Sequence, residues 1–192
     1  MNRQKELKSV MVWIHGGAFV SGYLSTPNSE PSTLVASSDV IVVTINYRLG
    51  ALGFMHLADS KATGNAGFLD QKLAMEWVHA NIKFFGGDNN KITLFGESAG
   101  AWSAGFHLFH EPSWPYFRNV IMQSGGPTGT SIFNIYLFYY RNGSGISTYK
   151  NINLTHKNEN LNLTFFFIKN CKKLSDNLPH HQYLIVYHIH NL

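Results

Sequence analysis

The sequence predicts an α/β fold, in which a mostly parallel sheet carries flanking helices. Continuous apolar runs, such as residues 10–14 and 91–95, are typical of strands that are buried on both faces of a parallel sheet. Segments with helical spacing, above all residues 67–85, separate these runs along the chain. Strands that alternate with helices form parallel sheets, because each crossover helix packs back onto the sheet.

The first part of the chain contains two predicted strands. The first, residues 10–14, leads into a glycine-punctuated loop at 16–22. Residues 33–36 can form a short helix, and residues 39–47 are predicted to be the second strand because they are rich in β-branched side chains. Residues 51–64 are polar and contain glycine, so we expect a loop there.

Residues 67–85 are predicted to form a long helix. Leu69, Leu73 and Trp77 recur at i, i+4 and i+8. With Val78 and Ile82 beside them, they give one apolar face that we expect to pack inward. Asp70 lies near the start of this helix, where its charge suits the helix dipole, and this indicates a structural role.

The segment Gly-Glu-Ser-Ala-Gly at 96–100 stands between a predicted strand and a predicted helix at 101–110. A serine at such a turn needs a strained backbone, and Gly96 and Gly100 remove the side chains that would collide there. The free N–H groups of the helix favour the negative charge that develops when a serine oxygen attacks a carbonyl. Ser98 is therefore the candidate nucleophile of a nucleophile elbow.

A glycine pair, Gly16 and Gly17, follows the first strand. Glycine lets the backbone come within hydrogen-bond distance of a substrate oxygen. The amides of Gly16, Gly17 and Ala99 are therefore candidate donors of an oxyanion hole. The alternative is a tight turn after a strand, which the presence of Ser98 disfavours.

The chain resembles the type-B carboxylesterase and cholinesterase family of α/β-hydrolases. The resemblance covers residues 10–126, about two thirds of the chain, in the ordered segments 10–19, 42–50, 53–54, 65–71, 77–82, 85–88, 92–100 and 123–125. It implies a partial α/β-hydrolase fold and a carboxylic ester hydrolase that acts on a small-molecule ester through a serine acyl-enzyme, without a cofactor or metal. Members of the family run to several hundred residues, so the resemblance also implies truncation at both ends.

The partners of the nucleophile are not identifiable. A serine hydroxyl needs a base, usually a histidine held by a carboxylate, and in α/β-hydrolases the acid and then the histidine follow the serine. The resemblance implies that both lie far downstream of the elbow, in sequence that this chain does not have. We therefore expect this chain to be inactive. Chain order alone allows Glu159 or Asp176 as the acid, and His180, His181, His188 or His190 as the base, without a supporting motif.

Other polar residues near the elbow have less specific roles. Glu97 and Ser124 match family positions near the nucleophile, where they could support a hydrogen-bond network or serve the structure alone. The resemblance implies that His15 shapes the glycine loop. His107 and His110 are interpreted as packed or exposed histidines rather than as the base.

Two other functions stay open. The chain could be a non-catalytic truncated product, or it could be an adhesion or binding module related to cholinesterases. Such modules generally lack the nucleophile, so Ser98 within its intact motif disfavours the second of these.

The composition changes near residue 130, after a predicted strand at 119–123. Residues 131–192 contain ten asparagines, eleven Phe or Tyr residues and no alanine, whereas residues 1–130 contain eleven alanines. Nothing in the later segment resembles the family. The sequence thus predicts a partial carboxylesterase domain at 1–130 and an unrelated low-complexity tail at 131–192, either poorly ordered or the product of an incorrect gene model.

The charge distribution and the lengths of the apolar runs argue against a nucleic acid partner and against a membrane span. The net charge of +4 arises entirely from residues 131–192, and without a basic helix or arginine cluster it does not indicate a nucleic acid partner. The longest apolar runs, 132–140 and 161–168, are too short to span a membrane. The N-terminus lacks the apolar segment of a signal peptide, and the single cysteine, Cys171, cannot form an internal disulfide. Localisation and oligomeric state therefore stay open, although members of the family are often secreted.

Overall fold

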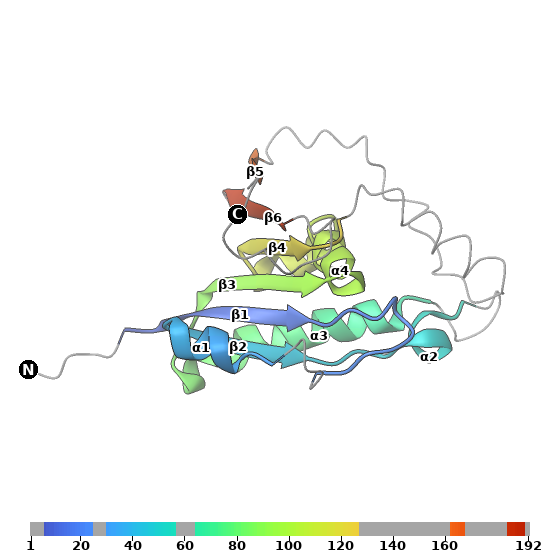
Figure 1. Cartoon of the computed structure of the whole chain (residues 1–192), viewed down its shortest axis with the longest axis horizontal. Coiled ribbons are helices and arrows are strands. Elements are labelled where there is room, and N and C mark those ends of the chain that lie inside the picture. Colours follow the sequence, from blue (N-terminus) through green and yellow to red (C-terminus); the bar gives the residue numbers. More distant parts are fainter. Residues whose placement is uncertain (1–5, 25–29, 57–63, 127–161, 168–183, 191–192) are drawn as a thin grey trace, which may run out of the picture.

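The protein is built on one six-stranded sheet with the strand order β2-β1-β3-β4-β6-β5 (Figure 1). The structure is a computed structural model, and it describes residues 6–24, 30–56, 64–126, 162–167 and 184–190. Helices and short 3₁₀ segments connect the first four strands, as the alternating sequence pattern predicts.

Four neighbouring strands of the sheet are parallel: β1 (Lys8–Ile14), β2 (Val40–Ile45), β3 (Gly87–Glu97) and β4 (Asn119–Gln123). Ile14 pairs with Ile45 on one side and with Gly96 on the other, so these strands end at the same level. Figure 1 shows their arrowheads pointing to one edge, close to the start of α4. This carboxyl edge is where open α/β sheets carry their sites.

The connecting helices are α1 (Ser32–Ser37), α2 (Gly50–Phe54), α3 (Ala66–Asn81), η2 (Ile82–Phe85), α4 (Ala99–His107) and η3 (Glu111–Tyr116). The prediction of a loop at 51–64 is wrong for α2, and residues 57–63 lie outside the described residues. This short helix forms because Gly53 and Phe54 are buried, with Phe54 in edge contact with Phe19.

The predicted apolar face of α3 and its 3₁₀ extension is confirmed for Val78 and Ile82 and is wrong for its other three residues. Leu69, Leu73 and Trp77 are 50%, 65% and 55% exposed. The buried positions of this helix and its 3₁₀ extension are Phe68, Gln71, Met75, Val78 and Ile82, which also recur at spacings of three and four. A pattern of apolar residues alone does not predict this second face, because Gln71 is polar and yet fully buried.

A buried polar network explains how Gln71 is accommodated. Its Nε2 donates to Ser103 Oγ (3.0 Å), which joins α3 to α4, and its Oε1 lies 3.2 Å from His107 Nε2. His107 Nδ1 lies 2.9 Å from Ser113 Oγ, and His110 Nδ1 lies 2.7 Å from the same oxygen. All of these hydrogen bonds can form when His107 is neutral, donates through Nε2 and accepts through Nδ1.

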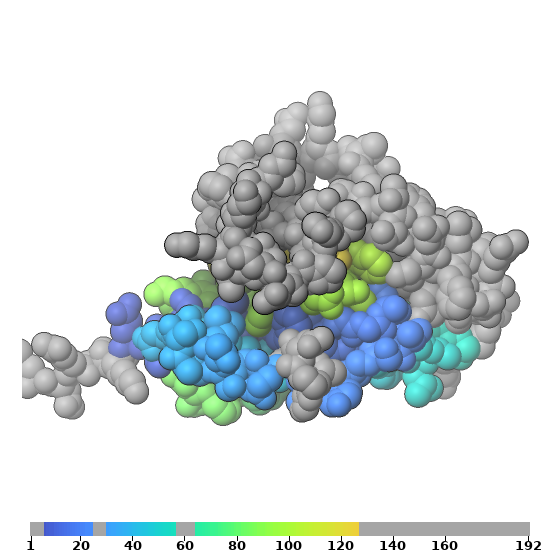
Figure 2. All heavy atoms as spheres, viewed as in Figure 1, coloured from blue at the N-terminus to red at the C-terminus, as the bar shows by residue number. Residues whose placement is uncertain are grey.

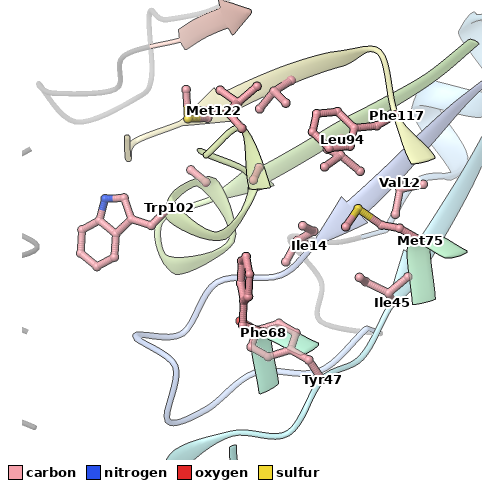
Figure 3. Close-up of a cluster of buried hydrophobic side chains, with 14 of the residues drawn as sticks. Val12, Ile14, Ile45, Tyr47, Phe68, Met75, Leu94, Trp102, Phe117 and Met122 are labelled. Carbon is pink, nitrogen blue, oxygen red and sulfur yellow. The ribbon is translucent and has the colours of Figure 1, made fainter. Parts of the chain in front are cut away.

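The apolar core surrounds the parallel strands. Strands β1 to β4 contribute Val12, Ile14, Ile45, Leu94 and Met122, and the helices contribute Phe68, Met75 and Trp102 (Figure 3). Fully burying side chains of this size stabilises the fold by about 1.5–3 kcal/mol each. The sequence-predicted strands at 10–14, 39–47, 91–95 and 119–123 therefore supply the core as expected.

Two strands fall within the segment that was predicted to be a low-complexity tail. These are β5 (Asn162–Phe167) and β6 (Leu184–His190), and β6 pairs antiparallel with both β4 and β5. The sequence pattern predicts no strand there, although the run at 184–187 is apolar and rich in strand-forming residues. The remaining residues of 127–192, with the predicted boundary near 130, lie outside the described residues.

We expect substitutions on the two faces of α3 to have different costs. Leu73→Gln should change the free energy of unfolding by no more than about 0.5 kcal/mol, because its side chain is already largely exposed. Met75→Ala should cost about 2–5 kcal/mol, because it leaves a cavity in the core. Urea unfolding of both variants measures this, and an equal loss in the two would contradict the assignment of the faces.

We expect the free energy of unfolding to fall as the pH drops below about 6.5. Burial, and then the positive field of His110 and Lys72, holds the pKa of His107 well below its usual value. The neutral imidazole therefore gains a proton only on unfolding, so stability is complete above the unfolded pKa and is lost as the pH falls toward the folded one.

The measurement is a series of urea melts between pH 8 and pH 5. His107→Gln should reduce the slope of stability against pH by up to about 1.4 kcal/mol per pH unit. The pKa values of His15, His79 and His110 are also lowered by burial, and these groups titrate in both proteins, so the difference isolates His107. Equal slopes would contradict the prediction.

Candidate active site

Ser98 occupies the turn between β3 and α4, and its backbone is strained. Its φ of 53° and ψ of −118° lie outside the regions that non-glycine residues prefer. Two backbone hydrogen bonds hold it there: its N–H donates to Gln123 O (2.9 Å), and its carbonyl accepts from the Trp102 N–H (3.0 Å). The half-buried serine therefore stands at the N-cap of α4, at the carboxyl edge of the sheet.

The glycines on either side of Ser98 allow the elbow to pack against β1. A Cβ on Gly96 would lie 2.5 Å from the Gly100 carbonyl carbon and 2.7 Å from Ile14 O. A Cβ on Gly100 would overlap Ile14 O and lie 2.9 Å from His15 O. All three distances are below those of real Cβ contacts, so only glycine permits this approach of α4 to the end of β1.

The loop at 15–24, which we call the β1 loop, lies directly against the elbow. A Cβ on Gly16 would lie 3.2 Å from Ser98 Cβ and 2.7 Å from Glu97 O. Figure 2 shows the blue atoms of this part of the chain beside the yellow-green atoms that follow β3. The structure thus brings the predicted residues Gly16 and Ser98 together, although they are far apart in the sequence.

Three consecutive residues of the β1 loop have positive φ. Gly17 has a φ of 110°, Ala18 of 54° and Phe19 of 63°. The Gly17 carbonyl accepts the N–H groups of Val20 and Ser21, both at 3.0 Å, and closes a tight turn. The sequence does not indicate strain at Ala18 and Phe19, because alanine and phenylalanine rarely adopt this conformation.

Ala99 is the first residue of α4 and is fully buried. The first amides of a helix have no partner within the helix and carry the positive end of its dipole. The position of Ala99, immediately after Ser98 at the start of a nine-residue helix, is compatible with its predicted role as a donor.

The predicted supporting residues border the elbow from two sides. Glu97 is exposed at the end of β3, and its Oε2 would lie 3.0 Å from a Cβ on Gly16, so its carboxylate is next to the β1 loop. Although the residue as a whole is exposed, its carboxyl group is partly desolvated, and this raises the pKa of Glu97. Ser124 has a positive φ of 55° just after β4, and the next residue, Gly125, packs against Ser98 O.

None of the histidines whose side chains the structure describes is hydrogen-bonded to Ser98 Oγ. His15 is buried, and its Nδ1 lies 2.8 Å from Gly16 O, which agrees with a role in shaping the loop. His107 and His110 belong to the polar network around Ser113. Their interpretation as packed residues is confirmed for His107, which is completely buried.

Two of the candidate partners from the later part of the chain, His188 and His190, lie in β6, away from the elbow in the described backbone. In β6, His188 pairs with Asn119 at the start of β4, whereas Gln123 at the end of β4 pairs with Glu97. The four residues between them put His188 roughly 13 Å from the carboxyl edge, and His190 lies further along the same strand. Glu159, Asp176, His180 and His181 lie outside the described residues.

The described residues contain no group of three or more His, Cys, Asp or Glu side chains that could hold a metal ion. None of the helices found there has the length and apolar character needed to cross a bilayer.

Comparison with known proteins places this geometry in a family context. The sequence profile of the carboxylesterase family matches residues 1–171, a longer stretch than the segment 10–126 on which the resemblance was recognised. The chain is 49% identical over 122 residues to acetylcholinesterase-1 of Trittame loki, which covers 64% of this chain and 22% of that protein.

Two further relatives give similar values. Acetylcholinesterase of Electrophorus electricus is 51% identical over 122 residues, which covers 63% of this chain and 19% of that protein. Cholinesterase 1 of Branchiostoma lanceolatum is 50% identical over 116 residues, 60% of this chain and 32% of that protein. The matched part of the chain thus spans between about a fifth and a third of the length of these relatives.

We expect Gly100→Ala to destabilise the protein by about 3 kcal/mol, because the new Cβ would overlap the backbone carbonyl of Ile14. Gly50→Ala is the matched control: it has a positive φ of 55° but open space around it, so it should cost only about 1 kcal/mol. Thermal or urea unfolding measures both. A gain in stability for Gly100→Ala, as expected for a glycine in an ordinary helix, would contradict the close packing.

Proposed function

Because the chain belongs to the carboxylesterase family, we propose that it supplies the nucleophile and the oxyanion-binding loop of a serine carboxylic ester hydrolase. The observation that carries the proposal is the strained backbone of Ser98 at the N-terminus of α4, with Gly16 of the β1 loop packed against it. All of these elements lie within residues 1–130, which we assign to the carboxylesterase domain.

In the proposed reaction, Ser98 Oγ attacks the carbonyl carbon of the ester while its proton passes to a base. The carbonyl oxygen becomes an oxyanion, which the amides of Gly16, Gly17 and Ala99 stabilise. The C–O bond to the alcohol then breaks, the alcohol leaves with a proton, and an acyl-enzyme remains. Water attacks this ester in the same way and releases the carboxylic acid and free Ser98.

In the proposed reaction, the helix dipole stabilises charge and the glycine packing positions the β1 loop. The N-terminus of α4 favours negative charge next to Ser98, at no reorganisation cost during the reaction. The packing of Gly16 on Ser98 Cβ keeps the β1 loop within reach of the same substrate oxygen. An amide donor in such a site is worth about 3 kcal/mol of transition-state stabilisation.

The part of the chain whose side chains are described supplies no base for the proposed site. None of its histidines is bonded to Ser98, and we propose that the serine becomes activated only when a base is supplied. Glu97 and Ser124 are proposed to support the elbow and not to take part in the proton transfer. The alternative of an adhesion or binding module has no observation in its favour.

The substrate is proposed at the level of its class. The relatives are named acetylcholinesterases and cholinesterases, and the class that these names share with the family is a small carboxylic ester. The proposed roles of Ser98 and of the three amides concern the ester carbonyl, which every member of this class contains.

A fluorophosphonate ester tests the proposal, because it reacts covalently with activated serines and needs no knowledge of the substrate. We expect slow labelling of the folded chain and at least tenfold faster labelling when imidazole is added as an external base, since base catalysis typically contributes 10²–10⁴-fold. Ser98→Ala should abolish labelling, whereas Ser32→Ala, an exposed serine in α1, should leave it unchanged.

Two results would overturn parts of this proposal. Rapid labelling of Ser98 without imidazole would show that the chain provides its own base. Absence of labelling in imidazole, in a chain whose cooperative melt shows that it is folded, would mean that Ser98 is not a competent nucleophile.

A further inference from the structure

We infer that residues 46–50, which follow β2 and which we call the brace, hold the β1 loop in its oxyanion-binding conformation, with Tyr47 as the principal positioning residue. The inference rests on the proposed function, because that function gives the β1 loop its role. It concerns a segment that does not itself touch Ser98 in any described contact.

Tyr47 binds the beginning of the β1 loop. Its hydroxyl donates to the His15 carbonyl at 2.8 Å in a buried hydrogen bond, and its ring stacks on the His15 imidazole with centroids 4.5 Å apart and planes 17° apart. The side chain is only 6% exposed and belongs to the hydrophobic core (Figure 3). Tyr47 thus connects the core directly to the residue that precedes Gly16.

The two ends of the brace bind the rest of the same loop. The Gly50 N–H donates to Phe19 O at 2.7 Å, in the middle of the β1 loop. Asn46 Oδ1 accepts the Leu24 N–H at 2.9 Å, near the end of the loop. Three residues of the brace therefore make hydrogen bonds at the start, the middle and the end of the β1 loop.

Arg48, in the middle of the brace, fixes the brace to α3. Its Nε and Nη2 donate to the two oxygens of Asp70 at 2.7 Å each, and its backbone N–H donates to Asp70 Oδ2 at 3.0 Å. The Arg48 carbonyl lies so close to Gly53 and Gly67 that a Cβ on either would overlap it. A bidentate pair with this packing gives the brace a defined position relative to a long helix.

The β1 loop needs such support because its conformation is not the one that its residues prefer. Ala18 and Phe19 have positive φ, which is unfavourable for residues with a Cβ and persists only where the surroundings enforce it. The brace binds on both sides of this strained pair, through His15 and Leu24, and at Phe19 itself. Loss of one of these bonds should therefore let the loop open locally.

Tyr47→Phe tests this with the smallest change, since it removes the hydroxyl and keeps the ring in the core. We measure hydrogen exchange of the Val20, Ser21 and Gly50 amides, which are hydrogen-bonded within the β1 loop or to it. The expected result is about tenfold faster exchange at these amides and unchanged exchange in β1 and β3, because the effect of one buried hydrogen bond is local here. Tyr116→Phe, a half-buried tyrosine on η3, is the matched control and should change none of them.

The rate of fluorophosphonate labelling in imidazole is the second readout, and it separates positioning from stability. If wild type is labelled, Tyr47→Phe should be labelled about tenfold more slowly at a temperature where the melts of both proteins show them fully folded. An unchanged labelling rate would overturn the inference, and so would unchanged exchange of the loop amides. If wild type is not labelled, the proposed function fails, and the exchange experiment still decides whether the brace holds the loop.

Asn46 provides an independent variant at an exposed position, where failure to fold is not a concern. Asn46→Ala removes the acceptor for the Leu24 amide and should speed exchange of that amide several-fold, whereas Asn46→Asp keeps an acceptor oxygen and should restore the slow exchange. Equal exchange in the two variants would contradict the part of the inference that concerns the end of the loop.

Discussion

The close approach of the end of β1 to the turn between β3 and α4 is the constraint on which the candidate site depends. Gly100 lies under the Ile14 carbonyl, Gly96 lies against Gly100, and Gly16 lies against Ser98. Because a Cβ on Gly96 or Gly100 would lie closer to backbone atoms than real Cβ contacts do, the end of β1 and the start of α4 meet through backbone atoms. The parallel pairing of β1 with β3 consequently places Ser98 next to the β1 loop.

Backbone strain on both sides of this contact is maintained by ordinary packing. Ser98 keeps its unusual dihedrals because Gln123 binds its amide and α4 begins immediately after it. On the other side, Phe19 keeps a positive φ while its ring is buried against Phe54 and Trp102. Strain of this kind costs on the order of 1–3 kcal/mol per residue, which a core of this extent offsets.

Helix α3 is hydrogen-bonded both to the brace and to α4, the two segments that hold the candidate site. Through Asp70 it binds Arg48 and so the segment that contacts the β1 loop. Through Gln71, the next residue, it binds Ser103 of α4, the helix that carries Ser98 at its N-terminus. Two adjacent polar residues on one helix thus link both halves of the candidate site, and this explains why the inward face of α3 is not purely apolar.

The sequence by itself determined the features that depend on neighbouring residues. The four parallel strands, the elbow at 96–100 and its need for glycine follow from apolar runs and from sterics within a few residues. The inward face of α3, the helix α2, the strands β5 and β6 and the role of Tyr47 were decided only by the tertiary structure. Leu69, Leu73 and Trp77 have the right spacing, but the face with Gln71 is buried because Ser103 and His107 satisfy its amide across helices. Local pattern shows that an element forms, whereas its buried face and its hydrogen-bond partners depend on residues that are distant in the chain.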